Sequence, residues 1–317
     1  MRSVKKWVLA TLILSFLVIV AGGVVRTTQS GMGCPDWPRC FGQWIPPTNA
    51  SELPVDFEKY LRAQDIDHSF NVYHTWIEYF NRLLGVLLGV FAIAQLYVIY
   101  PKRQKLQNAY KLAVAFLVIV ILTGLFGAAV VMLNLANLSI TIHFFFALIL
   151  SQIQLALYMN IKGRLNKKTA GIRARRALVI LLVIILIQCA LGTGVRMYVD
   201  NISKVLHYKQ RDAWLAGSPL SFIIHRGFSL LVLFSAFYVS NYVRKVSVLK
   251  THMRRLIGIL LTSMMTGLVL YYLDMPSLAQ PVHLLLGTLA VSQVMYTILY
   301  TKNTTDLLKP QVIPEPL

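Results

Sequence analysis

Residues 73–100 read YHTWIEYFNRLLGVLLGVFAIAQLYVIY, a long apolar stretch whose ionisable residues, His74, Glu78 and Arg82, lie near its start. A membrane-spanning helix needs about 20 consecutive apolar residues. The chain is 56% hydrophobic with a mean hydropathy of +0.62, which predicts an all-α integral membrane protein with eight transmembrane helices. The apolar runs lie near residues 7–26, 73–99, 112–133, 139–160, 177–199, 219–243, 256–273 and 281–300.

The positive charge of the chain follows the order of these runs. The net charge is +19, and 21 of the 31 Lys and Arg residues precede the first run, follow the last one, or lie between runs two and three, four and five, or six and seven. Cytoplasmic segments carry such an excess, so both termini are expected in the cytoplasm. The basicity therefore reports topology and argues against a nucleic-acid partner.

The first run follows basic residues, as a signal peptide does, but it lacks a clear small-residue cleavage site. We therefore expect a retained helix. The protein is predicted to lie in the inner (cytoplasmic) membrane, with residues 27–72 and 200–218 facing the periplasm or exterior.

Two of the three cysteines, Cys34 and Cys40, lie in the first outer segment with five residues between them. An oxidising compartment favours a disulfide over a metal site, which needs further ligands nearby. Cys189, inside the fifth run, is predicted to be a small packing residue.

Short matches in the same order divide the chain into two similar halves, residues 1–165 and 166–317. They predict two pseudo-symmetric four-helix bundles in the same orientation, the first carrying the outer loop 27–72. The alternative is chance recurrence in Gly-rich membrane helices. The matches pair Gly22, Val25 and Arg26 with Gly192, Val195 and Arg196, Asn81–Arg82 with His225–Arg226, Thr123–Gly124 with Thr266–Gly267, and His143 with His283.

Four histidines, His74, His143, His225 and His283, lie within the first seven residues of the even-numbered runs. At 1.5 Å per residue they form one layer within about 10 Å of the outer boundary. Two histidines on facing helices can bind a haem iron from both sides, which predicts a haem at His225 and His283 in the second bundle. The alternative is that each histidine bonds a neighbouring helix, and His74 has no counterpart in the repeat.

Arginines at the same level are candidate partners of the haem propionates. Arg82 and Arg226 each follow the candidate ligand position, and Arg26 and Arg196 are close by. For the latter two, extension to lipid headgroups is the alternative.

Glu78 has no counterpart in the sixth run. With His74 and Asn81 it shares one face of its helix, directed at the first bundle's site. Its predicted role is general base, proton acceptor or stabiliser of a developing cation; the alternative is a structural pair with Arg82. This asymmetry predicts one site for chemistry and one for electron transfer.

These residues resemble the haem A synthase family (CtaA type) over nearly the whole chain. The resemblance rests on VVRTTQSGMGCPDWPRCFG after the first run, WIEYFNR in the second, TGLFG, IHFFFAL, LGTGVRMYVD, HR and VHLLLG in the later ones. It implies oxidation of the C8 methyl of haem O to a formyl, which yields haem A for cytochrome oxidase.

The resemblance also implies site residues. His225 and His283 correspond to axial ligands of a haem b, His143 to the ligand of the haem O substrate, and Glu78 to the catalytic carboxylate. Cys34 and Cys40 correspond to a loop pair near that site.

Asn81 is the departure, since the family commonly has His there, as a second ligand of the substrate haem. An amide binds iron poorly, so we expect His143 alone to hold haem O, with Asn81 hydrogen-bonding nearby; His74 or water opposite His143 are the alternatives. The oxygen source stays open between water and activated oxygen.

Partners beyond the bilayer and haem O are an electron acceptor of unknown identity and, as a candidate, haem O synthase. The LLLGTLA stretch, residues 284–290, suits internal packing and homo-oligomer formation equally. The rival functions are a b-type cytochrome subunit that only transfers electrons, which needs haems near both faces, and a transporter, which needs polar residues at the midplane.

Overall fold

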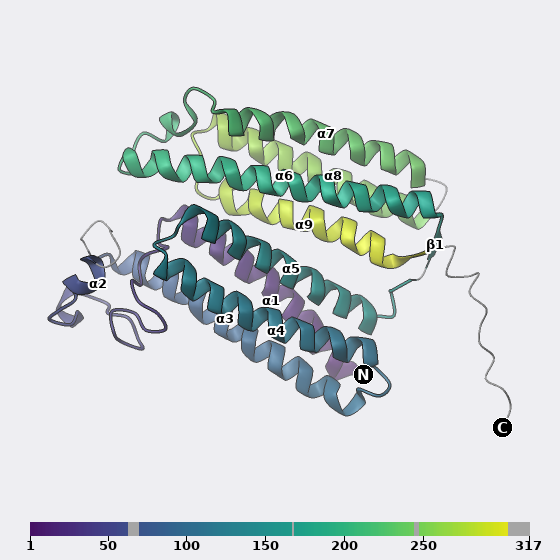
Figure 1. The fold of residues 1–317 in the computed structure, drawn as a ribbon, viewed down its shortest axis with the longest axis horizontal. Helices are drawn as coiled ribbons and strands as arrows, with labels where there is room; N and C mark the ends of the chain where they lie inside the picture. The colour runs from purple at the N-terminus through teal and green to yellow at the C-terminus, as the bar shows by residue number, and fades with distance from the viewer. Residues whose placement is uncertain (63–69, 167, 244–246, 304–317) are drawn as a thin grey trace.

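The computed structural model describes residues 1–62, 70–166, 168–243 and 247–303. Within these ranges, eight helices are long and apolar enough to cross a membrane, which confirms the predicted all-α multi-pass membrane fold (Figure 1). They are α1 (Arg2–Thr27), α3 (Val72–Ile99), α4 (Gln107–Met132), α5 (Asn137–Ile161), α6 (Ile172–Val205), α7 (Leu220–Val243), α8 (Ser247–Tyr272) and α9 (Ala279–Tyr300).

Several helices are longer than their apolar runs, and α1 and α4 each start five residues earlier than predicted. α6 starts five residues earlier and ends six later than predicted, and α8 starts nine residues earlier. Hydropathy marks only the apolar part of a helix, whereas Lys and Arg are good helix formers and extend it beyond the bilayer.

Short elements connect the long helices. Two three-residue strands pair in parallel, Lys168 with Thr301, which the sequence analysis did not predict. The short elements are η1 (Ala50–Glu52), α2 (Glu58–Arg62), η2 (Tyr100–Lys102), β1 (Lys168–Ala170), η3 (Arg211–Leu215) and β2 (Thr301–Asn303).

The long helices form two groups of four (Figure 1). In the first, α1 packs on α3, α3 on α4, α4 on α5 and α5 on α1; in the second, α6, α7, α8 and α9 close a similar ring. The groups meet where α9 packs against α1 and α5. Residues 28–62 and 206–219 lie at one end of the molecule, here called the loop end, where α3, α5, α7 and α9 begin.

The second helix of each group's last hairpin starts after the same turn. Asn134 and Leu135 after α4 have φ of 51° and 55°, and Asp274 and Met275 after α8 have φ of 55° and 56°. In both turns the second residue donates its N–H to the carbonyl five residues back at 3.0 Å, a typical helix C-terminal motif.

This shared turn sets the register of the repeat. It pairs each residue here with the one 140 positions later, so His143 matches His283 and Gly127 matches Gly267. The predicted match of Thr123–Gly124 with Thr266–Gly267 is therefore wrong by three residues. The sequence suggested the wrong match because the dipeptide Thr-Gly occurs at both places.

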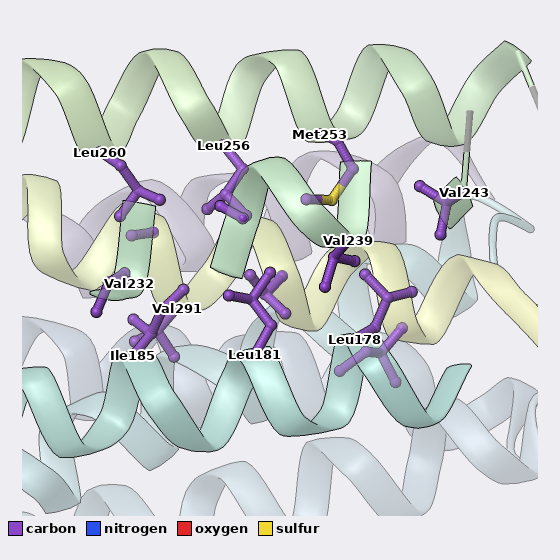
Figure 2. Close-up of a cluster of buried hydrophobic side chains, with 14 of the residues drawn as sticks. Leu178, Leu181, Ile185, Val232, Val239, Val243, Met253, Leu256, Leu260 and Val291 are labelled. Atoms are coloured by element: carbon purple, nitrogen blue, oxygen red, sulfur yellow. The ribbon is translucent and has the colours of Figure 1, made fainter. Parts of the chain in front are cut away.

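Each group has its own apolar core. In the second group, buried side chains of α6, α7, α8 and α9 form one continuous cluster (Figure 2). Among them Leu178, Leu181, Leu249, Met253 and Leu256 are at most 1% exposed. The first group is held by smaller clusters between α1, α3, α4 and α5.

A buried amide pair joins three helices of the first group. Gln95 of α3 and Gln154 of α5 exchange side-chain hydrogen bonds of 3.1 and 2.9 Å, and Gln154 also donates to the Val8 carbonyl of α1 at 3.0 Å. Both side chains are fully buried. Polar groups in an apolar interior are stable only when paired in this way.

We expect Gln154→Leu to lower the free energy of unfolding by about 1–2 kcal/mol, because it leaves the Gln95 amide buried without a partner. The double variant with Gln95→Leu should be less destabilised than Gln154→Leu alone. Unfolding in detergent, followed by circular dichroism, measures both. Additive losses would contradict a coupled pair.

Candidate functional site

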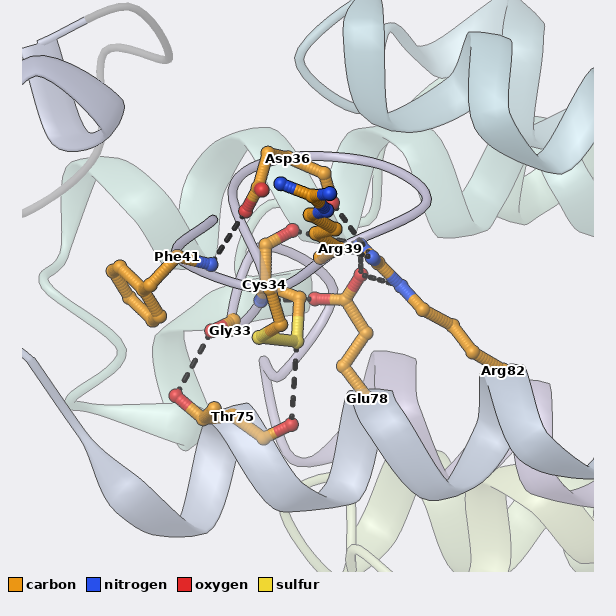
Figure 3. A network of polar contacts seen from close by, with 9 residues as sticks. Gly33, Cys34, Asp36, Arg39, Phe41, Thr75, Glu78 and Arg82 are labelled. Atoms are coloured by element: carbon orange, nitrogen blue, oxygen red, sulfur yellow. Dashed lines mark hydrogen bonds and ion pairs between the residues drawn. A yellow bond between two sulfur atoms is a disulfide. The ribbon is translucent and has the colours of Figure 1, made fainter. Parts of the chain in front are cut away.

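Glu78 is buried beneath the outer loop, two turns into α3, with an exposed fraction of 4%. Its Oε2 accepts the backbone N–H of Cys34 at 2.8 Å. Its Oε1 accepts from Nη2 and Nε of Arg82 at 2.6 and 3.1 Å (Figure 3). Oε1 thus has two donors, whereas Oε2 has one and keeps a free lone pair.

Arg82 uses every donor of its guanidinium within the protein. Besides Glu78, it donates to the backbone carbonyls of Cys34 at 2.8 Å, Asp36 at 2.6 Å and Arg39 at 2.9 Å. A guanidinium has five N–H groups, and all five are taken. The predicted propionate contact of Arg82 therefore requires one of these bonds to break.

The outer loop folds tightly around this pair. A disulfide joins Cys34 and Cys40, which confirms the predicted bond, and both residues are fully buried. The carboxylate of Asp36 accepts the N–H group of Phe41 at 2.6 Å (Figure 3). It also accepts the N–H group of Gly42 at 2.9 Å. These bonds close the loop so that its carbonyls point at Arg82.

Gly33 brings the loop against α3. A Cβ added at Gly33 would lie 2.2 Å from the carbonyl oxygen of His74. That distance is too short for any residue with a side chain. Thr75 also donates its hydroxyl to the Gly33 carbonyl at 2.9 Å. Gly33 thus packs against the backbone of His74, so His74 lies next to the loop rather than deeper in the bundle.

The second group brings His225 of α7 and His283 of α9 together. Their ring centres are 6.4 Å apart and their planes make an angle of 75°. Two imidazoles that share one metal through bonds of about 2 Å have ring centres about 6 Å apart, so the pair fits a haem iron between them. Gly192 of α6 faces His225, 3.0 Å from an added Cβ, and so leaves room for the ring.

The first group has no such pair in the part of it that the structure describes. His143 of α5 lies against Gly127, 3.2 Å from an added Cβ, and its Nδ1 is buried without a partner. Asn81 of α3 has a buried Oδ1 without a partner. Gly22 of α1, which the repeat pairs with Gly192, has no atom within 4 Å of an added Cβ. These unpaired polar atoms suit a ligand bound on one side by His143.

Arg226, the counterpart of Arg82, has a different environment. It is exposed, and its guanidinium lies 5.9 Å from the ring centre of Tyr271. Among the described residues it makes no ion pair, so its donors are available to a propionate.

Asp200, which was not predicted from the sequence as a site residue, joins the two groups at the loop end. Arg26 of α1 and Arg196 of α6 both form ion pairs with it, and Arg196 also bonds Gln280 of α9. Neither arginine is a lone side chain extended to lipid. The sequence did contain a signal for the Arg196–Asp200 ion pair, because Asp200 follows Arg196 by one helical turn.

Within the described ranges, no three or more His, Cys, Asp or Glu residues cluster as ligands for a metal ion. A haem, whose porphyrin supplies four ligands, needs only the one or two histidines found at each site.

The chain resembles known proteins over most of its length. Residues 5–295 match the family model COX15-CtaA, described as cytochrome oxidase assembly protein. It is 30% identical over 162 residues to heme A synthase of Shewanella oneidensis, which covers 50% of this chain and 46% of that protein. It is 35% identical over 141 residues to heme A synthase of Nitrosomonas eutropha, covering 41% and 38%. The chain thus aligns with less than half the length of these relatives.

We expect Arg82→Lys to loosen the outer loop, because lysine offers three donors on a point charge in place of a five-donor fork. At least two of the five bonds are lost, and a net loss of about 1.5 kcal/mol, the strength of a single charge-assisted bond, already makes reduction of the Cys34–Cys40 bond by a thiol about tenfold faster. Thiol labelling after timed reduction measures the rate. Arg39→Lys, on the exposed side of the loop, is the control. Equal reduction rates in the two variants would contradict the role of Arg82 in holding the loop.

Proposed function

Because this chain belongs to the COX15-CtaA family of cytochrome oxidase assembly proteins, we propose that it is a haem A synthase that oxidises the C8 methyl of haem O to a formyl. Its relatives' names support this activity. The observation that carries the proposal is the contrast between the halves: a matched histidine pair in one, and a single histidine with a buried carboxylate in the other. A purely electron-transferring cytochrome is disfavoured because every candidate ligand lies near the loop end.

In this proposal residues 166–317 form the electron-transfer half, where His225 and His283 hold a haem b through its iron. When bound, haem b supplies one-electron redox chemistry. Arg226 donates to a propionate at the aqueous boundary, and Gly192 keeps the space that the His225 ring needs. Electrons leave to an acceptor at the membrane.

Residues 1–165 form the substrate half, where His143 binds the iron of haem O and Asn81 offers its amide to a group on the open side. Glu78 stabilises positive charge that develops at the substrate methyl, and its Oε2, which has a free lone pair, accepts the released proton. Arg82 holds this carboxylate in place. Water supplies the oxygen.

The proposed topology places both termini in the cytoplasm and the two haem sites near the outer face of the inner membrane. Haem O then enters the first half from the lipid side, where haem O synthase delivers it.

The activity is tested by co-expressing the protein with a source of haem O in a host without haem A synthase, and identifying extracted haems by mass. We expect haem A and its hydroxylated precursor, and a loss of product of about 100-fold in Glu78→Gln. Asp56→Asn, an exposed carboxylate of the same outer loop, is the control. A folded, haem-loaded protein without either product would refute the proposal.

If His143 alone binds the iron of haem O, a histidine introduced at position 81 should give that iron a second ligand. With haem O bound, the wild-type spectrum should contain a high-spin component, and Asn81→His should convert it to low spin by restoring a second imidazole. Electron paramagnetic resonance measures the change. His74→Ala should leave the spin state unaltered, because position 74 lies about 10 Å along the helix from position 81; a change there would contradict the assignment.

A further inference from the structure

A hydroxyl group contacts one of the candidate haem ligands. Thr266 of α8 lies one residue before Gly267, whose added Cβ would lie 3.5 Å from the His283 ring. Its Oγ1 is 2.9 Å from Nδ1 of His283 and 2.8 Å from the Ser263 carbonyl oxygen. The hydroxyl thus lies between an imidazole nitrogen and a backbone acceptor.

The direction of these bonds follows from the number of hydrogens. The Ser263 carbonyl can only accept, so the single hydroxyl hydrogen of Thr266 is donated to it. The lone pairs of Oγ1 then accept Nδ1–H of His283. With Nδ1 protonated, Nε2 carries the lone pair and is the nitrogen available to a metal.

Neither of the other candidate ligands has a hydroxyl hydrogen-bonded to its Nδ1 in the described part of the structure. The Nδ1 atoms of both His143 and His225 are buried and have no partner among the described residues. In the register set by the shared turn, the residue that matches Thr266 is Phe126, which cannot accept a hydrogen bond. Among the described residues, His283 is therefore the only one of the three histidines whose Nδ1 contacts a side-chain hydroxyl.

We propose that Thr266 is a positioning residue that fixes the tautomer of His283 and lowers the reduction potential of the haem that His283 binds. This rests on the proposed function, which places a haem between His225 and His283. A hydrogen bond from Nδ1 makes the imidazole a stronger donor, and stronger donation favours ferric over ferrous iron. A haem held by His283 would then give up an electron more readily.

The experiment compares Thr266→Val and Thr266→Ser in the full-length, haem-loaded protein by redox titration of the low-spin haem. We expect a positive shift of the midpoint potential and altered low-spin resonance positions in Thr266→Val, and wild-type values in Thr266→Ser. Thr123→Val is the matched control, because Thr123 also donates to a backbone carbonyl of its own helix, that of Ile119, but contacts no histidine. It should leave the potential unchanged.

A wild-type potential in Thr266→Val with full haem content would overturn the proposal. If Thr266→Val binds no haem, the serine variant decides, since restored binding with the wild-type potential supports positioning and continued loss overturns it. A wild-type protein without any low-spin haem would instead refute the haem assignment under the proposed function.

Discussion

The carboxylate–guanidinium pair of Glu78 and Arg82 is the interaction on which the loop end of the first group depends. A charge inside an apolar helix costs several kcal/mol unless an opposite charge neutralises it and its remaining hydrogen-bonding atoms also have partners. Three carbonyl groups of the loop accept hydrogen bonds from Arg82, and one N–H group of the loop donates to Glu78. The loop therefore folds onto α3 because the pair cannot be left unsatisfied, and the pair is tolerated in α3 because the loop covers it.

The same constraint shapes the contact between the two groups. Arg26 and Arg196 approach each other at the loop end, and Asp200 lies between them as their shared counter-ion. Toward the opposite end of the first group, the Gln95–Gln154 pair satisfies its own amides. In each case a polar group on one helix selects its neighbour, which apolar packing between lipid-exposed helices does less specifically.

The sequence predicted the eight spans, the disulfide and the positions of the histidines within their helices, because hydropathy, cysteine spacing and helical rise act locally. It did not predict how Arg82 is used, since its acceptors lie 43–48 residues away on an irregular loop. The repeat register also failed near Gly124, where the left-handed turns after α4 and α8, rather than the glycines, define the equivalence. Asp200 and Thr266 were visible in the sequence, but only three-dimensional contacts give them partners.

The differences between the halves fit two haems with different residence times under the proposed function. The second half offers two histidines and an arginine with free donors, which suits a cofactor that stays bound. In the first half, Asn81 replaces one histidine and the loop occupies the equivalent arginine, so haem O would have one iron ligand and fewer charge-assisted contacts. A substrate has to leave as product, and each bond omitted from its site speeds that release. The departure at Asn81 and the commitment of Arg82 to the loop then serve the same end, because both weaken the hold on haem while leaving Glu78 fixed beside it.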